Sequence, residues 1–269
     1  MVRVAALQLS SQADVSENLR GVRGLLDRAA ADGASVALLP EGFAFLGSEV
    51  DKARHAETFG AGGPIQDFLQ ETAARLDLTL IAGGMPERSD VPERPYNTSV
   101  VIGPDGSVLE RYRKVHLFDV ELSDGTKLTE SAGNSAGDVP RTVELSGLIF
   151  GLSICYDLRF PELFAAERQA GAHVLTVPAA FTVTTGRAHW HVLLRARAIE
   201  TQCYVVAPAQ WGSHPRDRHT FGHTLIVDPW GEIVAEWGEG VGLATAEISL
   251  ERIESVRAQM PIAAHRRLV

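Results

Sequence analysis

Apolar residues recur along the chain with two spacings, and these spacings predict alternating strands and helices. Residues 2–9 alternate between apolar and polar positions as a half-buried strand does. Residues 15–31 carry apolar positions at helical spacing and end close to Gly33. Similar patterns predict further strands at 35–39, 79–82, 99–102, 108–111, 143–145, 148–154, 173–177, 203–207, 224–227, 232–236 and 243–248, and further helices at 64–76, 160–170, 186–200 and 250–259.

Short turn signals interrupt this alternation and favour hairpins at three places. Pro104-Asp105-Gly106, Ser146-Gly147 and the run from Asp228 to Gly231 each separate two apolar segments. A purely parallel α/β sheet would contain fewer hairpins, so we predict a layered α/β fold with mixed sheets. No repeat and no low-complexity linker divides the chain, which favours one domain over residues 1–269. Residues 119–140 lack clear periodicity and are expected to form a long functional loop.

Composition and charge narrow the range of partners. The 269 residues carry 25 basic and 34 acidic side chains, a net charge of −9 that argues against nucleic-acid binding. The N-terminus does not resemble a signal peptide, and no segment is long and apolar enough to span a bilayer. Two cysteines give no disulfide framework. We therefore expect a cytoplasmic protein with a small-molecule partner, without membrane or nucleic-acid association.

Three predicted strands end in a chemically reactive side chain. Glu41 follows the strand at 35–39, Lys114 follows the strand at 108–111, and Cys155 follows the strand at 148–154. Strand ends are where active sites of α/β folds collect. A cysteine nucleophile needs a base, a role open to a carboxylate whose pKa burial raises, and a lysine ammonium can stabilise an oxyanion. The backbone N–H of Tyr156 would be a second oxyanion donor.

Each of these residues also has an ordinary structural explanation. A cysteine after an apolar run is often a small core residue, as we expect for Cys203. His116 and His189 are further candidates for a base near the Cys155 thiol in space. The residues alone do not choose between these interpretations.

The local sequences around the three residues resemble the signatures of the nitrilase superfamily of carbon–nitrogen hydrolases. The matching contexts are LLPEGF, YRKVHLFD and GLSICYDLRFPEL, in this order and at this spacing. The resemblance implies a four-layer α-β-β-α sandwich and a Glu-Lys-Cys triad that forms a thioester or thioimidate, with neither metal nor organic cofactor. It also implies a homodimer, for which we expect contacts near residues 160–170 and the C-terminal tail.

Glu130 occupies the place where the family often has a second glutamate. It lies 16 residues after Lys114 in KLTESAG. The resemblance implies that Glu130 helps to position substrate and catalytic groups. Without the resemblance, the simpler interpretation is a solvated loop carboxylate.

Further residues near the predicted nucleophile are candidates for substrate binding. Arg159 lies one helical turn after the cysteine and could grip a substrate carboxylate with two hydrogen bonds. The alternative is an ion pair with Glu162 or Asp157, residues to which we assign structural roles. Thr182 and Thr185 lie in the loop before the helix at 186–200, and their hydroxyls are expected to line the acyl pocket with Tyr156.

Within the superfamily, residues 200–235 most resemble amidases that act on deaminated glutathione, with Gln210 and His214 in the most similar detail. This resemblance implies hydrolysis of a small carboxylated amide to an acid and an amine or ammonia. The alternatives are an omega-amidase acting on 2-oxoglutaramate, an N-carbamoyl-amine hydrolase and a nitrilase. An alternative of a different class is a catalytically silent binding module of the same fold.

The histidines do not form a sequence pattern typical of a metal site. His189 and His191 are two residues apart, whereas helical zinc ligands are typically four apart. His214, His219 and His223 lie in a turn-rich segment without a partnering cysteine or carboxylate pattern. From these spacings we expect no metal site.

Overall fold

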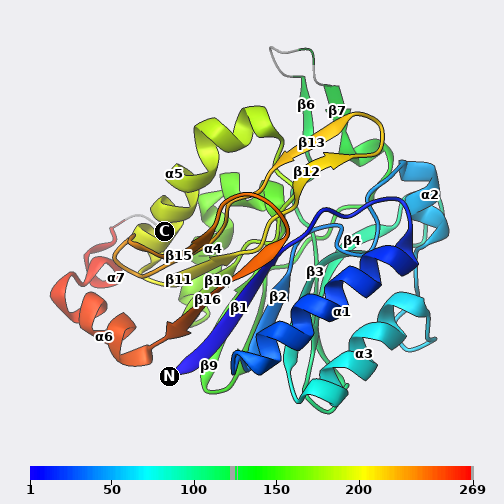
Figure 1. Cartoon of the computed structure of the whole chain (residues 1–269). Coiled ribbons are helices and arrows are strands. Elements are labelled where there is room, and N and C mark those ends of the chain that lie inside the picture. Colours follow the sequence, from blue (N-terminus) through cyan, green and yellow to red (C-terminus); the bar gives the residue numbers. More distant parts are fainter. Residues whose placement is uncertain (122–124, 126, 268–269) are drawn as a thin grey trace.

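Two six-stranded mixed sheets pack face to face, and helices cover the outer face of each (Figure 1). The computed structural model describes residues 1–121, 125 and 127–267. The first sheet has the strand order β16-β1-β2-β3-β4-β5, and the second has the order β15-β14-β11-β10-β9-β8. Helices α1 and α3 pack on the first sheet, and α4 and α5 on the second. The predicted four-layer α-β-β-α sandwich is confirmed.

The bounds of the elements are as follows. The strands are β1 (Val2–Gln8), β2 (Val36–Leu39), β3 (Thr79–Glu87), β4 (Tyr96–Ile102), β5 (Val108–Arg113), β6 (Asp119–Glu121), β7 (Lys127–Thr129), β8 (Arg141–Leu145), β9 (Leu148–Leu152), β10 (Val174–Thr176), β11 (Tyr204–Ala207), β12 (Trp211–His214), β13 (Arg218–Phe221), β14 (Thr224–Val227), β15 (Ile233–Trp237) and β16 (Gly242–Ile248). The helices are α1 (Val15–Ala31), α2 (Glu49–Arg54), α3 (Pro64–Leu76), α4 (Pro161–Gln169), α5 (Val183–Thr201), α6 (Leu250–Gln259) and α7 (Ile262–His265), with 3₁₀ turns η1 (Glu130–Ala132) and η2 (Cys155–Arg159).

Strand β1 shows how the layers use the two faces of a strand. Val4 and Ala6 belong to the core shared by the two sheets, whereas Ala5 and Leu7 belong to the core beneath α1 and α3. Successive side chains of a strand point to opposite faces, so each set reaches a different core. The prediction of a half-buried strand was therefore wrong, because both faces of β1 are covered.

Local signals place the helix ends as expected for α1 and α3. The Asp14 side chain caps α1 by accepting a hydrogen bond from the backbone N–H of Glu17. Pro64 occupies the first turn of α3, where its missing N–H costs no hydrogen bond. The helix predicted at 186–200 begins earlier, at Val183, because Thr182 caps it. The threonine-rich segment is thus the first turn of α5 and not a loop.

Several elements were missed or predicted wrongly, among them the short C-terminal helix α7. Short helix α2 and the hairpin β12–β13 were not predicted. The stretch 119–140 is not a loop throughout: its described residues include the paired strands β6 and β7 and the turn η1, while 122–124 and 126 lie outside the described residues. The predicted hairpins β4–β5, β8–β9 and β14–β15 are present.

Within the described residues, no helix has the length and apolar character needed to cross a membrane.

Candidate active site

The structure brings Glu41, Lys114 and Cys155 together from the ends of two strands of the first sheet and one strand of the second. Glu41 follows β2, Lys114 follows β5, and Cys155 begins η2 three residues after β9. The Lys114 Nζ atom donates a hydrogen bond to Glu41 Oε1 at 2.9 Å, and the Cys155 thiol lies close enough to the Glu41 carboxylate for each group to shift the pKa of the other. All three side chains are buried, so their mutual contacts replace contacts with water. The packing of the two sheets is what joins these positions.

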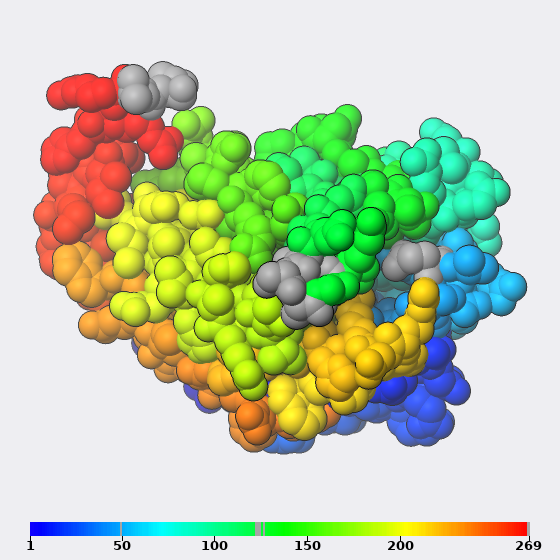
Figure 2. Space-filling view, turned by 90° about the horizontal axis from the view of Figure 1, so that it is seen from above, coloured from blue at the N-terminus to red at the C-terminus, as the bar shows by residue number. Residues whose placement is uncertain are grey.

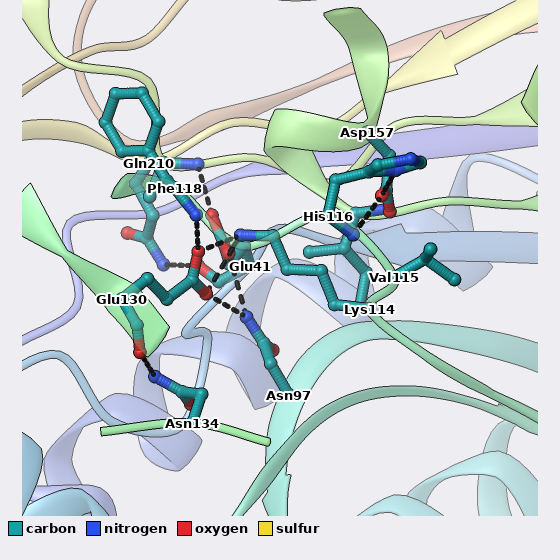
Figure 3. A network of polar contacts seen from close by, with 12 residues as sticks. Glu41, Asn97, Lys114, Val115, His116, Phe118, Glu130, Asn134, Asp157 and Gln210 are labelled. Carbon is teal, nitrogen blue, oxygen red and sulfur yellow. Dashed lines mark hydrogen bonds and ion pairs between the residues drawn. The ribbon is translucent and has the colours of Figure 1, made fainter. Parts of the chain in front are cut away.

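The Glu41 carboxylate is held on both oxygens (Figure 3). Its Oε1 accepts hydrogen bonds from Lys114 Nζ and Asn97 Nδ2, each at 2.9 Å. Its Oε2 accepts one from the backbone N–H of Ala180 at 3.1 Å. These donors leave the carboxylate little freedom to rotate, and its orientation toward the thiol is set before a ligand arrives. Sequence reasoning missed Asn97, because a strand asparagine in YNTSV carries no distinctive signal.

Lys114 lies between two carboxylates. Its Nζ atom donates to Glu130 Oε1 at 3.0 Å and Oε2 at 2.8 Å, in addition to Glu41. Glu130 Oε2 also accepts the backbone N–H of Phe118 at 2.7 Å, and the Asn134 amide donates to the Glu130 carbonyl (Figure 3). The alternative of a solvated loop carboxylate was therefore wrong. Glu130 orients the lysine that contacts Glu41.

The pKa of Glu41 is lowered, whereas burial was expected from the sequence to raise it. Burial alone would raise it, but the Lys114 charge and hydrogen bonds from Cys155 and Lys114 outweigh burial and lower the pKa to about 2. Burial and the adjacent Glu41 charge raise the pKa of the Cys155 thiol well above its usual value. Burial opposes the charge on Lys114, but Glu130 and Glu41 raise its pKa well above normal. The resting site thus contains a carboxylate, an ammonium and a neutral thiol.

The backbone at Cys155 adopts a conformation that is uncommon for residues with a side chain. Its φ is +53°, in the left-handed region, and its N–H is held by the Pro178 carbonyl at 2.9 Å. Such conformations persist when surrounding contacts enforce them, and they cluster at functional sites. The next N–H, of Tyr156, belongs to the first turn of η2, where backbone donors lack a partner within the helix. This N–H directly follows Cys155 in the chain.

Asp157 connects the turn that carries Cys155 to the segment that carries Lys114. It accepts hydrogen bonds from the Tyr112 hydroxyl at 2.7 Å and the His116 backbone N–H at 3.0 Å. Tyr112 and His116 lie two residues before and after Lys114. The Nδ1 atom of the His116 ring also lies 2.7 Å from Asp157 Oδ1. His116, which the sequence left open as a base for the Cys155 thiol, is thus paired with Asp157. The structural role assigned to Asp157 is thus the alignment of these two segments.

A cavity of about 690 Å³ opens onto these residues. Its walls come from segments far apart in sequence: the region around α2, the region of β7 and η1, the start of α5, and the β12–β13 connection. Figure 2 looks onto this end, where light-blue, green and gold segments meet. Cationic side chains outnumber carboxylates in the described lining: Lys52, Lys114, Lys127, Arg159, Arg216 and Arg218 stand against Glu41, Glu130 and Asp217. A negatively charged ligand would therefore meet a favourable local field despite the negative net charge.

Arg159 lines this cavity and forms no ion pair with a carboxylate of the described residues. Its guanidinium lies 5.4 Å from the centre of the Phe181 ring and 5.7 Å from that of Tyr156. Its Nη1 atom is 3.3 Å from His189 Nδ1. The alternative of an ion pair with Glu162 or Asp157 was wrong. The aromatic rings support the guanidinium and leave its charge uncompensated, as a carboxylate-binding group requires.

The two predicted threonines also line the cavity, but their hydroxyls contact each other. Thr182 Oγ1 and Thr185 Oγ1 are 2.9 Å apart, and Thr182 Oγ1 accepts the Thr185 N–H at 3.4 Å. This pair caps α5 at the cavity wall. The hydroxyls therefore shape the first turn of α5 as well as the cavity surface.

Arg218 is a cavity residue that sequence reasoning missed. One of its terminal nitrogens donates to the Ala180 carbonyl at 3.3 Å, while its buried Nε has no hydrogen-bond partner among the described residues. Its charge also contributes to the lowered pKa of Glu41, after burial and the contacts of Lys114 and Cys155. The arginines in HPRDRH were visible, but the unpredicted hairpin decides which of them faces Glu41.

Comparison with known proteins gives a consistent assignment. The family model described as carbon–nitrogen hydrolase matches residues 3–258. The chain is 49% identical over 265 residues to the deaminated glutathione amidase of Synechocystis sp., covering 97% of each chain. It is 41% identical to the human protein of that name, covering 98% of this chain and 82% of the human one.

A solved structure extends the likeness to the fold. Saccharomyces cerevisiae Nit3, described as a member of branch 10 of the nitrilase superfamily, has a TM-score of 0.89 and 34% identity. The match covers 99% of this chain and 97% of Nit3. The chain therefore belongs to the carbon–nitrogen hydrolases of the nitrilase superfamily and is a hydrolase that acts on carbon–nitrogen bonds.

Proposed function

We propose that this protein is a cysteine-dependent amidase with Cys155 as nucleophile, Glu41 as base and Lys114 as oxyanion donor. One observation carries the proposal: a single carboxylate, that of Glu41, is hydrogen bonded to the Lys114 ammonium and interacts electrostatically with the Cys155 thiol, and all three residues line the cavity. A nucleophile, a proton acceptor and a fixed positive charge are the groups that acyl transfer requires.

Acylation starts from the neutral thiol. As the sulfur bonds to the amide carbon, its proton passes to Glu41, and the carbonyl oxygen gains negative charge. Lys114 Nζ and the Tyr156 N–H stabilise this oxyanion. Because the pKa of the thiol is raised and that of Glu41 is lowered, the proton moves together with bond formation and not before it. Glu41 then protonates the departing nitrogen, the carbon–nitrogen bond breaks, and a thioester remains.

Deacylation repeats these steps with water. Glu41 accepts a proton from the attacking water, the same two donors hold the oxyanion, and the carbon–sulfur bond breaks. The proton returns to the sulfur, and the acid leaves. Glu130 acts here as a positioning residue, because it holds Lys114 through both carboxylate oxygens. No step of this cycle requires a redox change, so the residues present can complete it.

We propose deaminated glutathione as the first-choice substrate within a class of small carboxylated amides. The cationic cavity lining and the charge of Arg159 support an anionic substrate. Relatives that bear the name of this activity share 41–49% identity with nearly the whole chain. A substrate with carboxylates at both ends suits Arg159 on one wall and Arg216 and Arg218 on the β12–β13 connection.

The nucleophile is tested by substitution. We expect Cys155→Ala to abolish product release from deaminated glutathione while circular dichroism stays unchanged, since the thiol contributes little packing. Cys203→Ala is the matched control, because Cys203 is a buried core thiol that donates to the Ala172 carbonyl. Iodoacetamide should alkylate Cys155 and spare Cys203. Normal turnover by Cys155→Ala would refute the proposal.

The substrate is tested separately by comparing kcat/KM for deaminated glutathione and for the shorter 2-oxoglutaramate. A higher value for deaminated glutathione supports the proposal, whereas a preference for the shorter amide would assign this protein to the omega-amidases. A neutral amide serves as the reference for carboxylate recognition. Equal turnover of all three amides would show that the cationic lining does not select carboxylated substrates.

We further propose that residues 1–269 form one carbon–nitrogen hydrolase domain that acts as a homodimer in the cytoplasm. The family model spans residues 3–258, and the two sheets share one apolar core, which supports a single domain. Both cysteines are free thiols, which suits a reducing compartment.

A further inference from the structure

Two histidines and a glutamate converge away from the cavity. His191 lies on α5, His223 precedes β14, and Glu236 lies on β15. His191 Nε2 is 3.0 Å from Glu236 Oε1, and His223 Nδ1 is 2.7 Å from the same oxygen. The sequence around His223 shows no partnering carboxylate pattern, and the fold supplies Glu236 as the partner. The sequence did not reveal this group, because its members are 32 and 13 residues apart and meet only through packing.

The spacing of the three ligand atoms fits a transition-metal ion. One donor atom from each residue lies within 4.8 Å of the other two. Around tetrahedral zinc, metal–ligand bonds of about 2.0–2.1 Å separate neighbouring donors by roughly 3.3 Å. The observed contacts of 3.0 and 2.7 Å to Glu236 are slightly shorter, and the two histidine nitrogens lie within 4.8 Å of each other. Side-chain rotations that bring the histidine nitrogens together would therefore admit an ion. Two imidazole nitrogens and one carboxylate oxygen are ligands that zinc accepts.

The cluster is held in place by its surroundings. His223 has a φ of +58°, its N–H donates to the Gly238 carbonyl at 3.0 Å, and its carbonyl accepts the Trp190 indole N–H at 2.8 Å. The Phe221 ring stacks on the His223 ring with 4.3 Å between centroids. These contacts fix an uncommon backbone conformation and point the His223 Nδ1 atom at Glu236. Ordered ligands bind a metal at a lower entropic cost.

A shared hydrogen bond alone is the competing explanation. In that case both rings share one carboxylate oxygen, with their centroids 5.1 Å apart. A metal ion would satisfy the three ligand atoms at once without placing both rings on one acceptor. The side chains of all three residues are about one-third exposed or less, so water can reach the fourth coordination position.

We propose that His191, His223 and Glu236 form a binding site for a divalent first-row transition ion, with Zn²⁺ as the preferred probe. The site is separate from the amidase cavity, because none of the three residues lines it. A bound ion would join α5, whose first turn forms part of the cavity wall, to the edge of the second sheet. This inference does not depend on the proposed function.

The decisive measurement is calorimetric titration of untagged protein with ZnCl₂ in the Cys155→Ala background, which removes the active-site thiol as a competing ligand. We expect one Zn²⁺ per chain. His191→Ala and Glu236→Gln, each in that background, should weaken binding at least about tenfold, since outer-shell changes alone cost that much. His265→Ala, which removes an exposed histidine on α7, should bind as the parent does.

A second probe and a folding control complete the test. Co²⁺ should give visible absorption bands of a nitrogen- and oxygen-ligated ion, and His191→Ala should abolish them. Alanine is the best helix former, and normal turnover by His191→Ala with Cys155 intact would show that α5 is undisturbed. Absence of Zn²⁺ binding by the parent, or binding that neither His191→Ala nor Glu236→Gln weakens, would overturn the proposal.

Discussion

At the scale of single residues, Glu41 keeps its negative charge because Lys114 lies beside it. Burial favours the protonated acid, and the ammonium reverses that preference. Lys114 in turn is balanced by two carboxylates, those of Glu41 and Glu130. Removing the ammonium would therefore change the protonation of the base as well as remove an oxyanion donor.

This coupling predicts a distinctive pH response. In the parent enzyme, Glu41 is ionised and Cys155 is a thiol throughout about pH 5–8, so these groups should leave kcat/KM flat there. Lys114→Met should lower the rate by at least ~100-fold. Because burial then raises the pKa of Glu41, part of the activity should return as the pH increases.

Glu41→Gln is the matched comparison, because glutamine has the shape of the base but cannot ionise. It should also lose at least ~100-fold in rate, with no recovery at higher pH. The measurement is kcat/KM against pH for the three proteins. An acid limb near pH 6 in the parent enzyme would show that another group, not Glu41, is the base.

Arg159 gives a second prediction at this scale. Its side chain rests on Phe181 and Tyr156 and has no carboxylate partner among the residues described, so its charge is available to a substrate. Arg159→Lys keeps the charge but loses the planar two-donor grip. We expect the preference for carboxylated over neutral amides to fall about tenfold or more, the scale of a charge-assisted hydrogen bond. An unchanged ratio of kcat/KM values for the two amides would contradict the role.

At the scale of elements, the sequence predicted the strand ends well because apolar runs stop sharply before Glu41 and Cys155. It did not predict the β12–β13 hairpin. The segment from Trp211 to Phe221 is polar and lacks regular alternation, and it is held by long-range contacts such as the Phe221 N–H to the Phe181 carbonyl. The spacing of apolar positions predicts single strands and helices, and it contains no information about contacts between distant segments.

In the candidate site as well, local sequence did not predict the residues that depend on long-range contacts. Glu41, Lys114 and Cys155 stand in distinctive local sequences, so resemblance identified them. Asn97 and Arg218 stand in ordinary ones, and only the packing of β4 and the β12–β13 hairpin gives them contacts near Glu41.

The hairpin supplies a prediction of its own. Arg218 lines the cavity next to Ala180, and its buried Nε has no hydrogen-bond partner within the part of the chain that the structure describes. Arg218→Ala should raise KM for a substrate with two carboxylates more than for a neutral amide, because a distant carboxylate loses its cation. Arg187→Ala is the control, since Arg187 is exposed on α5 and lies outside the cavity lining. Equal changes in KM for both amides, or for both variants, would argue against carboxylate binding by Arg218.

At the scale of the whole molecule, the structure changes which apolar side chains are available for a dimer contact. A dimer contact was expected near residues 160–170, a segment whose apolar side chains include Leu163 and Phe164. Leu163 and Phe164 instead belong to the core beneath α4, so they are not available to a partner. Exposed apolar side chains lie elsewhere, around a shallow hollow lined by Ile199, Trp230 and Met260. The C-terminal segment, red in Figure 2, projects from that end of the molecule.

We therefore expect a homodimer whose contact includes this hollow and the C-terminal helices. Ile199, Trp230 and Met260 are each 45% exposed, and burial of such side chains against a second copy would stabilise association. Light scattering at low micromolar concentration should give about twice the chain mass of 29.0 kDa. Trp230→Glu should shift the equilibrium toward monomer, because it places a charge in the apolar contact. Leu109→Glu, an equally exposed site on β5 of the other sheet, should leave the dimer intact. A parent protein that stays monomeric would contradict the expected dimer. A dimer that Trp230→Glu does not weaken would contradict the expected contact.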